Sequence, residues 1–255
     1  MNDLTKAQSL GFKFGKNGAH AARSMMLEEL RTLLASHPAN ASKDDYQSDI
    51  VELNVLHKST ENARRLTFRH LVDLYGMSPE IPLFNVFRKL WDVSEDAQPL
   101  LAFQLAVARD PLLRGSIPVI MELQEGEHLP RETMEAHLAH DDPDRFSPAS
   151  LKSFSQNING SWTMAGYLTG RTKKFKTKPK VSYVNVAFAL FLAHCHGVSG
   201  QRLFTSSWFQ LLGCDLAQGF ELAYAASLRG LINFKQASEI IEVTFSNLIA
   251  PELMA

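Results

Sequence analysis

Hydrophobic residues in the first 140 positions recur at the spacing of helices that bury one face. In "ARSMMLEELRTLL" the apolar positions Met25, Met26, Leu30, Leu33 and Leu34 fall on one side of a helix. No segment before residue 140 alternates convincingly with period two, as a half-buried strand would. The pattern therefore predicts a helical bundle over residues 21–145.

The starts and ends of these helices are marked by residues with known capping preferences. Ser42 precedes "KDDYQSDIVELNVL" and is a favourable N-cap. Ser59 or Thr60 is in position to cap the next helix, "STENARRLTFRHLVDLYG", which we expect to end at Gly76. We expect residues 1–20 to form a flexible arm, in which Lys13 and Lys16 supply a weak basic character.

The pattern changes after residue 145, where helical segments alternate with short segments of strand character. "SPASLKSFSQNING" predicts one helix, "SWTMAGYL" a second short helix, and "TGRTKKFKTKPK" a hairpin before a new helix at Tyr183. Helix, turn, helix and basic hairpin is the order of a winged helix. We therefore expect residues 146–198 to form a winged-helix-like module with a lysine-rich wing.

The last fifty residues repeat this plan. "LFTSSWFQLLG" and "LAQGFELAYAASLRG" predict two helices, and "LINF", "KQAS" and "EIIEVTF" predict a two-stranded hairpin. This second wing carries only Lys235 against Glu239 and Glu242, so a structural or protein-binding role stays open. The predicted fold class is mainly α: a helical bundle followed by two winged-helix-like modules with small β-hairpins, the second over residues 199–255.

Charge is distributed unevenly along a chain whose formal net charge is only -1. Six of the twelve residues from Thr169 to Lys180 are Lys or Arg, and none is acidic. A solvated loop explains such a run, but its place on a wing favours contact with phosphates. The candidate phosphate ligands are Lys152, Arg171, Lys173, Lys174, Lys176, Lys178 and Lys180. On a strand, the last four of these would point to one face.

Two further sets of residues are candidates for contact with nucleic acid. Asn159, Ser161, Trp162 and Thr163 lie where a recognition helix would begin, although each is as suited to capping that helix as to contacting a base. A second basic surface on the helical half would contain Arg65 and Arg69, four positions apart on one helix.

No motif for catalysis, a cofactor or a metal is complete. "GFKFGKNG" lacks the spacing and the Ser or Thr of a phosphate-binding loop, and His194, Cys195 and His196 fit a helix end better than a zinc site. We therefore name no catalytic residue, no metal ligand and no cofactor. With only two cysteines, Cys195 and Cys214, we expect free thiols in a reducing compartment. No apolar run is long enough to cross a membrane. Together these observations favour the cytoplasm.

The segments "LEELRTLLA", "NVLHKSTENARRLTFRHL" and "ARDPLLRG" give the chain a resemblance to a known family. Over residues 25–125 the order of these pieces resembles the BrxA proteins of bacterial BREX phage-defence systems. The resemblance implies a helical part similar to the antitermination factor NusB and DNA binding without enzymatic activity. It also implies partners among the other proteins of the defence system.

These observations together predict a non-enzymatic protein that binds double-stranded DNA through its basic wing, within a BREX-type defence system. One alternative is a protein-interaction or scaffold subunit whose lysines meet an acidic partner. The other is an RNA-binding protein that uses its NusB-like bundle. Self-association into a homo-oligomer stays open.

Overall fold

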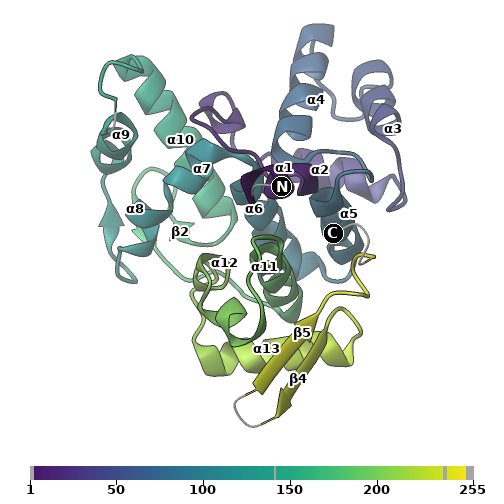
Figure 1. Ribbon diagram of the computed structural model, residues 1–255. Coiled ribbons are helices and arrows are strands. Elements are labelled where there is room, and N and C mark those ends of the chain that lie inside the picture. The colour runs from purple at the N-terminus through teal and green to yellow at the C-terminus, as the bar shows by residue number, and fades with distance from the viewer. Residues whose placement is uncertain (1–2, 141, 238–239, 251–255) are drawn as a thin grey trace.

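A computed structural model describes residues 3–140, 142–237 and 240–250 of the chain. It is mainly helical with two small antiparallel sheets, which confirms the predicted fold class at that level. Two groups of helices stand side by side in Figure 1, one around α9 and α10 and the other around α3 and α4. The last helices and the second hairpin lie below them.

The helical half is built from short helices joined by tight connections. Its α-helices are α1 (Asp3–Leu10), α2 (Leu27–Ala35), α3 (Lys43–Gln47), α4 (Glu61–Tyr75), α5 (Pro82–Trp91), α6 (Gln98–Arg109), α7 (Pro111–Gly115), α8 (Ile117–Met121) and α9 (Arg131–Ala139). Between them lie the 3-10 turns η1 (Ala19–Ala21) and η3 (Glu95–Ala97), the π-helical turn η2 (Ser48–Glu52), and the strand β1 (His128–Leu129).

The remainder of the chain alternates helices with short strands. Its elements are α10 (Pro148–Met164), β2 (Leu168–Thr169), β3 (Lys174–Lys176), α11 (Tyr183–Cys195), the 3-10 turn η4 (Gly200–Thr205), α12 (Ser207–Gln210), α13 (Leu216–Leu228), β4 (Asn233–Ala237) and β5 (Ile240–Thr244).

The predicted helix starts at Ser42 and Thr60 and the predicted helix end at Gly76 are confirmed. The Ser42 hydroxyl accepts a hydrogen bond from the Asp45 amide at 3.2 Å, and the Asp45 carboxylate accepts one from the Ser42 amide, which completes a capping box. The Thr60 hydroxyl caps α4, and Gly76 ends it at a φ of 91°. Such a φ is open to glycine without strain, which explains the stop.

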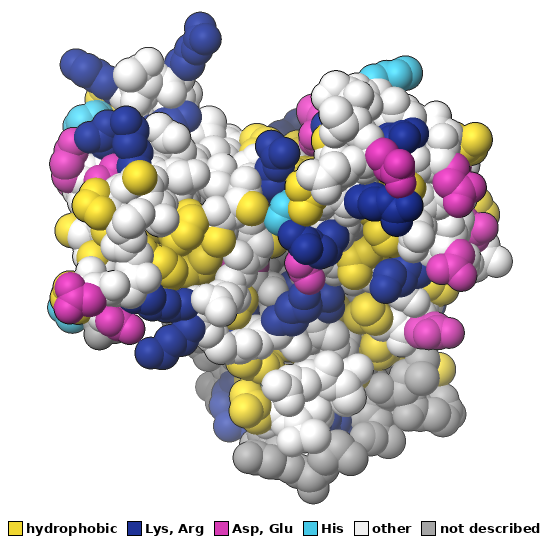
Figure 2. Space-filling model, turned by 90° about the horizontal axis from the view of Figure 1, so that it is seen from above, with side chains coloured by type: hydrophobic (Ala, Val, Ile, Leu, Met, Phe, Trp, Pro, Cys, Tyr) yellow, Lys and Arg dark blue, Asp and Glu magenta, His cyan; other side chains and the backbone are white. Residues whose placement is uncertain are grey.

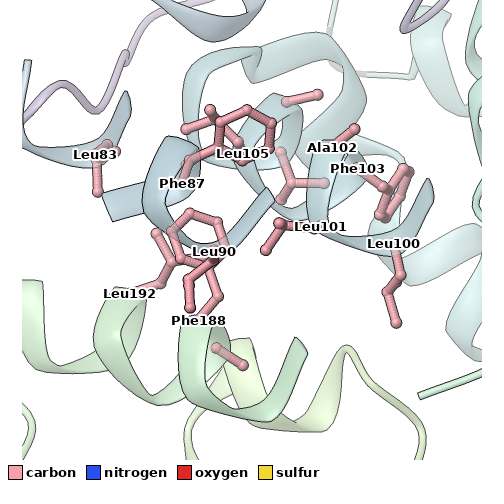
Figure 3. Packing of buried hydrophobic residues seen from close by; sticks show 14 of the residues in the cluster. Leu83, Phe87, Leu90, Leu100, Leu101, Ala102, Phe103, Leu105, Phe188 and Leu192 are labelled. Atoms are coloured by element: carbon pink, nitrogen blue, oxygen red, sulfur yellow. The ribbon is translucent and has the colours of Figure 1, made fainter. Parts of the chain in front are cut away.

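Helices α6 and α11 form the centre of the core, because both are mainly apolar and buried on every side. All residues of α6 from Leu100 to Arg109 are buried, and α11 is buried from Val184 to Ala193. Figure 3 shows side chains of α5, α6 and α11 packing together, and the Phe87 and Phe188 rings lie 6.4 Å apart. One hydrophobic cluster contains residues from Ala7 to Ile249, so the division into a bundle and two modules stays a prediction.

The N-terminal residues differ from the expected flexible arm. Residues 3–10 form α1, and Ala7, Leu10 and Phe12 are buried in the common core. The Lys13 amide then donates to the Ala108 carbonyl at the end of α6. The short, polar N-terminal sequence gave no sign of this docking, because its apolar partners come from distant parts of the chain. Met1 and Asn2 lie outside the described residues.

The second predicted hairpin is present. Strands β4 and β5 pair antiparallel, with Phe234 opposite Val243, and α12 and α13 precede them in the expected order. The turn was predicted at "KQAS", residues 235–238, and this is wrong for Lys235, Gln236 and Ala237, which continue β4. Ser238 and Glu239 lie outside the described residues, as do residues 251–255. Helix α13 leaves Tyr224 and Leu228 57% and 68% exposed, and it contains no Lys or Arg.

In the part of the chain that the structure describes, none of the helices combines the length and the apolar character that crossing a membrane requires.

Candidate nucleic-acid interface

A strand lies in the lysine-rich stretch between two helices, as predicted. Strand β3 pairs antiparallel with β2, with Thr169 opposite Phe175. On its other side β3 pairs with β1, so the hairpin belongs to a three-stranded sheet in the order β1-β3-β2. The third strand was not predicted, because a two-residue strand has no recognisable pattern. It ties the hairpin to the segment before α9.

The turn of this hairpin depends on Gly170. Its φ is 94°, and a Cβ at this position would overlap the Lys173 carbonyl oxygen. The Lys174 ammonium donates to the Gly170 carbonyl at 2.7 Å, which closes the turn further. The geometry holds Arg171, Thr172 and Lys173 at the tip, where all three are exposed.

The lysines do not form the single charged face that the period-two spacing predicted. Lys174 and Lys176 share a face of β3, but both are half-buried, and burial lowers the pKa of each. The Lys176 ammonium lies 5.1 Å from the centre of the Tyr167 ring, a cation–π contact inside the molecule. These two ammonium groups are therefore only partly available to an outside partner.

Nearer α11, the basic residues have acidic partners. The Lys178 ammonium lies 3.2 Å from a Glu125 carboxylate oxygen, and the Lys180 ammonium lies 2.6 Å from a carboxylate oxygen of Asp96. The ion pair holds the pKa of Asp96 below its ordinary value. At the tip, in contrast, none of the ion pairs found among the described residues includes Arg171 or Lys173. At the tip of the hairpin, Arg171 and Lys173 therefore carry charge that no carboxylate of the described residues offsets. At its base, the charges of Lys178 and Lys180 are offset by Glu125 and Asp96.

The predicted turn before Ser161 is wrong, because α10 is one helix from Pro148 to Met164. Ile158 and Trp162, four positions apart, are both fully buried and hold this part of the helix against the core. Gly160 is carried within the helix without a break. Asn159, Ser161, Trp162 and Thr163 therefore belong to the last turns of a long helix and not to the start of a recognition helix.

The burial of these residues decides what they can contact. Ser161 and Trp162 are 0% exposed, so neither can reach a base, and the expectation for both is wrong. The Trp162 indole donates to the Ser116 hydroxyl at 2.8 Å, and the Thr163 hydroxyl donates to the Asn159 carbonyl within the helix. Lys152, two turns earlier on α10, is exposed.

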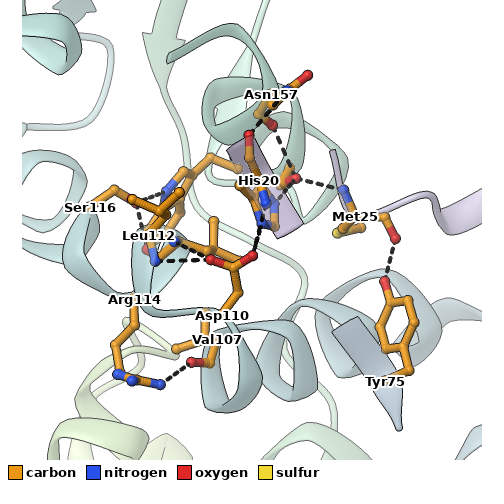
Figure 4. Close-up of polar contacts among 12 residues, drawn as sticks. His20, Met25, Tyr75, Val107, Asp110, Leu112, Arg114, Ser116 and Asn157 are labelled. Carbon is orange, nitrogen blue, oxygen red and sulfur yellow. Dashed lines mark hydrogen bonds and ion pairs between the residues drawn. The ribbon is translucent and has the colours of Figure 1, made fainter. Parts of the chain in front are cut away.

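Ser161 belongs to a buried polar network that the sequence did not reveal. Figure 4 shows its members His20 and Asp110. The His20 ring lies between the Asp110 carboxylate, 2.9 Å from Nδ1, and the Ser161 hydroxyl, 2.7 Å from Nε2. Because an ionised carboxylate only accepts hydrogen bonds, Nδ1 carries a proton toward Asp110. The Ser161 hydroxyl also accepts from the Met25 amide.

A hydroxyl, an imidazole and a carboxylate in this order are the groups of a hydrolase triad. Here all three are sealed, with exposures of 0%, 0% and 1% for Ser161, His20 and Asp110. Asp110 also caps α7 by accepting from the Leu112 and Leu113 amides. We assign the network a structural role, in which it joins the segment before α2 to α7 and α10.

The protonation of Asp110 follows from its partners. Burial alone would raise the pKa of this carboxyl. The hydrogen bond and charge of His20, with the amides of Leu113 and His20, outweigh burial and hold the pKa below its ordinary value. The group is therefore ionised in the folded protein near neutral pH.

A pocket of about 660 Å³ opens beside the hairpin tip, between β1, α9, α10 and the β2–β3 turn. Its lining includes three of the predicted site residues, Asn159, Arg171 and Lys174. It also includes His128 and Gln156, which the sequence gave no reason to select, because they come from elements brought together only by the fold.

The second predicted basic surface lies on α4, beside a hollow that separates the two groups of helices. Figure 2 shows Lys and Arg side chains in and beside this hollow. Arg69 is exposed and lines a cavity of about 460 Å³ with Lys13 and His70. Burial, then the positive charges of Arg69 and Arg23, lower the pKa of His70. Arg65 instead pairs with Glu61 at 2.7 Å, and both side chains are exposed.

The structure thus brings Asn159, Arg171 and Lys174 together and leaves Arg65 and Arg69 on a separate surface. No group of three or more His, Cys, Asp or Glu residues is placed to hold a metal ion within residues 3–140, 142–237 and 240–250. No protein-family model matches the chain, and no curated protein matches it.

Proposed function

We propose that this chain is a DNA-binding protein that contacts the phosphates of duplex DNA through the tip of the β2–β3 hairpin. The supporting observation is the uncompensated charge of Arg171 and Lys173, both exposed in a turn fixed by Gly170. Phosphate contacts supply most of the affinity of sequence-independent binding. The burial of Ser161 and Trp162 removes the helix-turn-helix from the proposal, so the hairpin carries the contact.

The setting of this binding, a BREX-type phage-defence system in bacteria, rests on the sequence resemblance over residues 25–125. In this proposal the chain performs no chemistry and acts with other proteins of the system.

The test compares two double variants of the same stretch. Arg171→Ala with Lys173→Ala removes the uncompensated tip, and Lys178→Ala with Lys180→Ala removes the same number of charges from the compensated base. Each phosphate contact adds about 0.9 to the slope of log affinity against log salt. We expect the tip variant to flatten this slope by about 1 to 2 units on any duplex sequence, and the base variant to change it by less.

Fluorescence anisotropy on a labelled duplex at several salt concentrations measures both slopes, and circular dichroism checks that the variants fold. Equal slopes for the tip variant and the wild type would overturn the assignment to the hairpin. A third variant, Arg65→Ala with Arg69→Ala, locates the contact in that case, because its own loss of slope would place DNA on α4. Competition with duplex RNA distinguishes the RNA-binding alternative.

A further inference from the structure

The pocket beside the hairpin tip combines the three kinds of side chain that hold a nucleotide. Amide groups come from α10, a ring comes from β1, and cations come from the β2–β3 hairpin. The volume of about 660 Å³ lies within the range of ordinary ligand pockets, about 300–1,000 Å³.

The amides are those of Asn159 and Gln156, one helical turn apart on α10. Asn159 is only 7% exposed, and its Oδ1 has no hydrogen-bond partner among the described residues. Buried polar atoms in proteins are normally paired, so this oxygen is an unsatisfied acceptor in the pocket wall, and a turn of the Asn159 side chain would bring it to a ligand donor. Gln156 is exposed at the same pocket. Asn and Gln amides offer a donor and an acceptor side by side, which matches the edge of a base such as adenine.

The ring is that of His128. Strand pairing places His128 opposite Phe175, and their rings lie 5.3 Å apart at 52°. His128 lines the pocket, and Phe175 remains 38% exposed next to it. Unpaired bases stack on aromatic and histidine rings of this kind. The sheet fixes the backbone of His128, and the contact with the Phe175 ring helps to hold the imidazole at the pocket.

The cations are Arg171 and Lys174, at the mouth of the hairpin turn. One carboxylate, Glu132, also lines the pocket, and it shares the guanidinium of Arg131, a third basic lining residue, with Glu135: Arg131 lies 3.3 Å from Glu132 and 3.0 Å from Glu135. The charge of Glu132 is thus partly offset by its neighbour, while Arg171 is free of ion pairs among the described residues. The hairpin side of the pocket therefore suits a phosphate.

We infer that this pocket takes one unpaired nucleotide, with its base at His128, Gln156 and Asn159 and its phosphate at Arg171 and Lys174. The inference rests on the proposed DNA binding and deepens it, because it makes a strand end or an unpaired base the preferred target. A free nucleotide shares this chemistry, and the experiment separates the two sources.

The experiment compares a blunt duplex with the same duplex carrying one unpaired adenine nucleotide at a strand end. Anisotropy measures the affinity of the full chain for each. Stacking of one base contributes about 1–3 kcal/mol, or about 5- to 150-fold in affinity, so we expect the overhang to bind about tenfold more tightly. Gln156→Ala and His128→Ala, both at exposed positions, should each reduce this advantage and leave blunt binding unchanged. Gln218→Ala, an exposed glutamine on α13, is the matched control and should change neither.

The outcomes separate this inference from the proposed function. Salt-dependent blunt binding with no advantage for the overhang would overturn the pocket inference and leave the hairpin contact standing. If neither duplex binds, the proposed function fails, and calorimetry with deoxyadenosine monophosphate tests the pocket alone. Saturable binding that Gln156→Ala abolishes would then support a free nucleotide as the ligand, and no heat of binding would overturn the inference.

Discussion

Replacing Asp110 by Asn tests whether the buried network holds the N-terminal segment in place. The change keeps the shape of the side chain and removes its charge. In the folded protein the carboxylate accepts hydrogen bonds from the His20 amide and ring and from the Leu112 and Leu113 amides. An Asn oxygen can still accept from α7, but the Asn amide group then faces the His20 N–H, and two donors meet.

The cost follows from the groups left unpaired. A buried donor without a partner costs about 1–3 kcal/mol, and hydrogen bonds to a charged group contribute about 1.5–3 kcal/mol. The Asn oxygen still accepts the hydrogen bonds from α7, so only part of the contribution of the charged hydrogen bonds is lost. We therefore expect Asp110→Asn to lower the free energy of unfolding by about 2–4 kcal/mol. For a chain of this size this corresponds to a fall in Tm of roughly 5–15 °C.

Urea unfolding followed by circular dichroism measures the difference, as a shift of the midpoint at constant slope. Asp96→Asn is the matched control, because it makes the same change at an exposed ion pair with Lys180. If Asp110→Asn lowers stability no more than Asp96→Asn does, the network does not hold the segment, and the reasoning is refuted.

The difference in stability between the wild type and Asp110→Asn should depend on pH, and the direction of that dependence follows from the pKa of Asp110. The pKa of Asp110 is depressed in the folded state, so its contribution is fully present above the unfolded value of about 3.9. It is lost as the pH falls through the depressed folded pKa. Asn does not titrate. The stability difference between the wild type and Asp110→Asn should therefore be constant near neutral pH and shrink in acid, and a difference that grows below pH 4 would contradict the assignment.

Two further predictions concern packing and reactivity. Gly18→Ala should clearly lower the unfolding midpoint, because the added Cβ would overlap the Asp110 carboxylate. Gly115→Ala is the control and should change the midpoint little, because no other part of the described chain lies within 4 Å of its Cβ position. Comparable midpoints for the two variants would contradict this reasoning. A thiol reagent should modify Cys214 before Cys195, because Cys195 is only 5% exposed and burial strongly raises the pKa of its thiol. Mass spectrometry of peptides taken at successive times shows the order of labelling. Faster labelling of Cys195 would refute the prediction.

Local sequence determined most of the secondary structure. Capping residues such as Ser42 and Thr60 and the stop at Gly76 act within one helical turn, so their effect could be predicted without a partner. The same holds for the existence of a hairpin within "TGRTKKFKTKPK", since its Thr and Phe residues favour strands by their own conformational preferences, although its strands end at Lys176 and the turn set by Gly170 was not predicted. The mainly helical class and the two hairpins followed from such short-range preferences, whereas strand β1, which completes the three-stranded sheet, did not.

Only the tertiary structure decided which of these residues are accessible. Ser161 was a plausible base-contacting residue until the fold brought it to His20, 141 positions away, where both are buried. The lysines looked alike along the chain, yet Lys180 meets Asp96, 84 positions away, while Lys173 at the tip has no such partner among the described residues. Burial and charge compensation depend on neighbours that are distant in sequence, and no local pattern records them. For the same reason the pocket of His128, Gln156 and Asn159 exists only where the folded chain brings β1, α10 and the hairpin together.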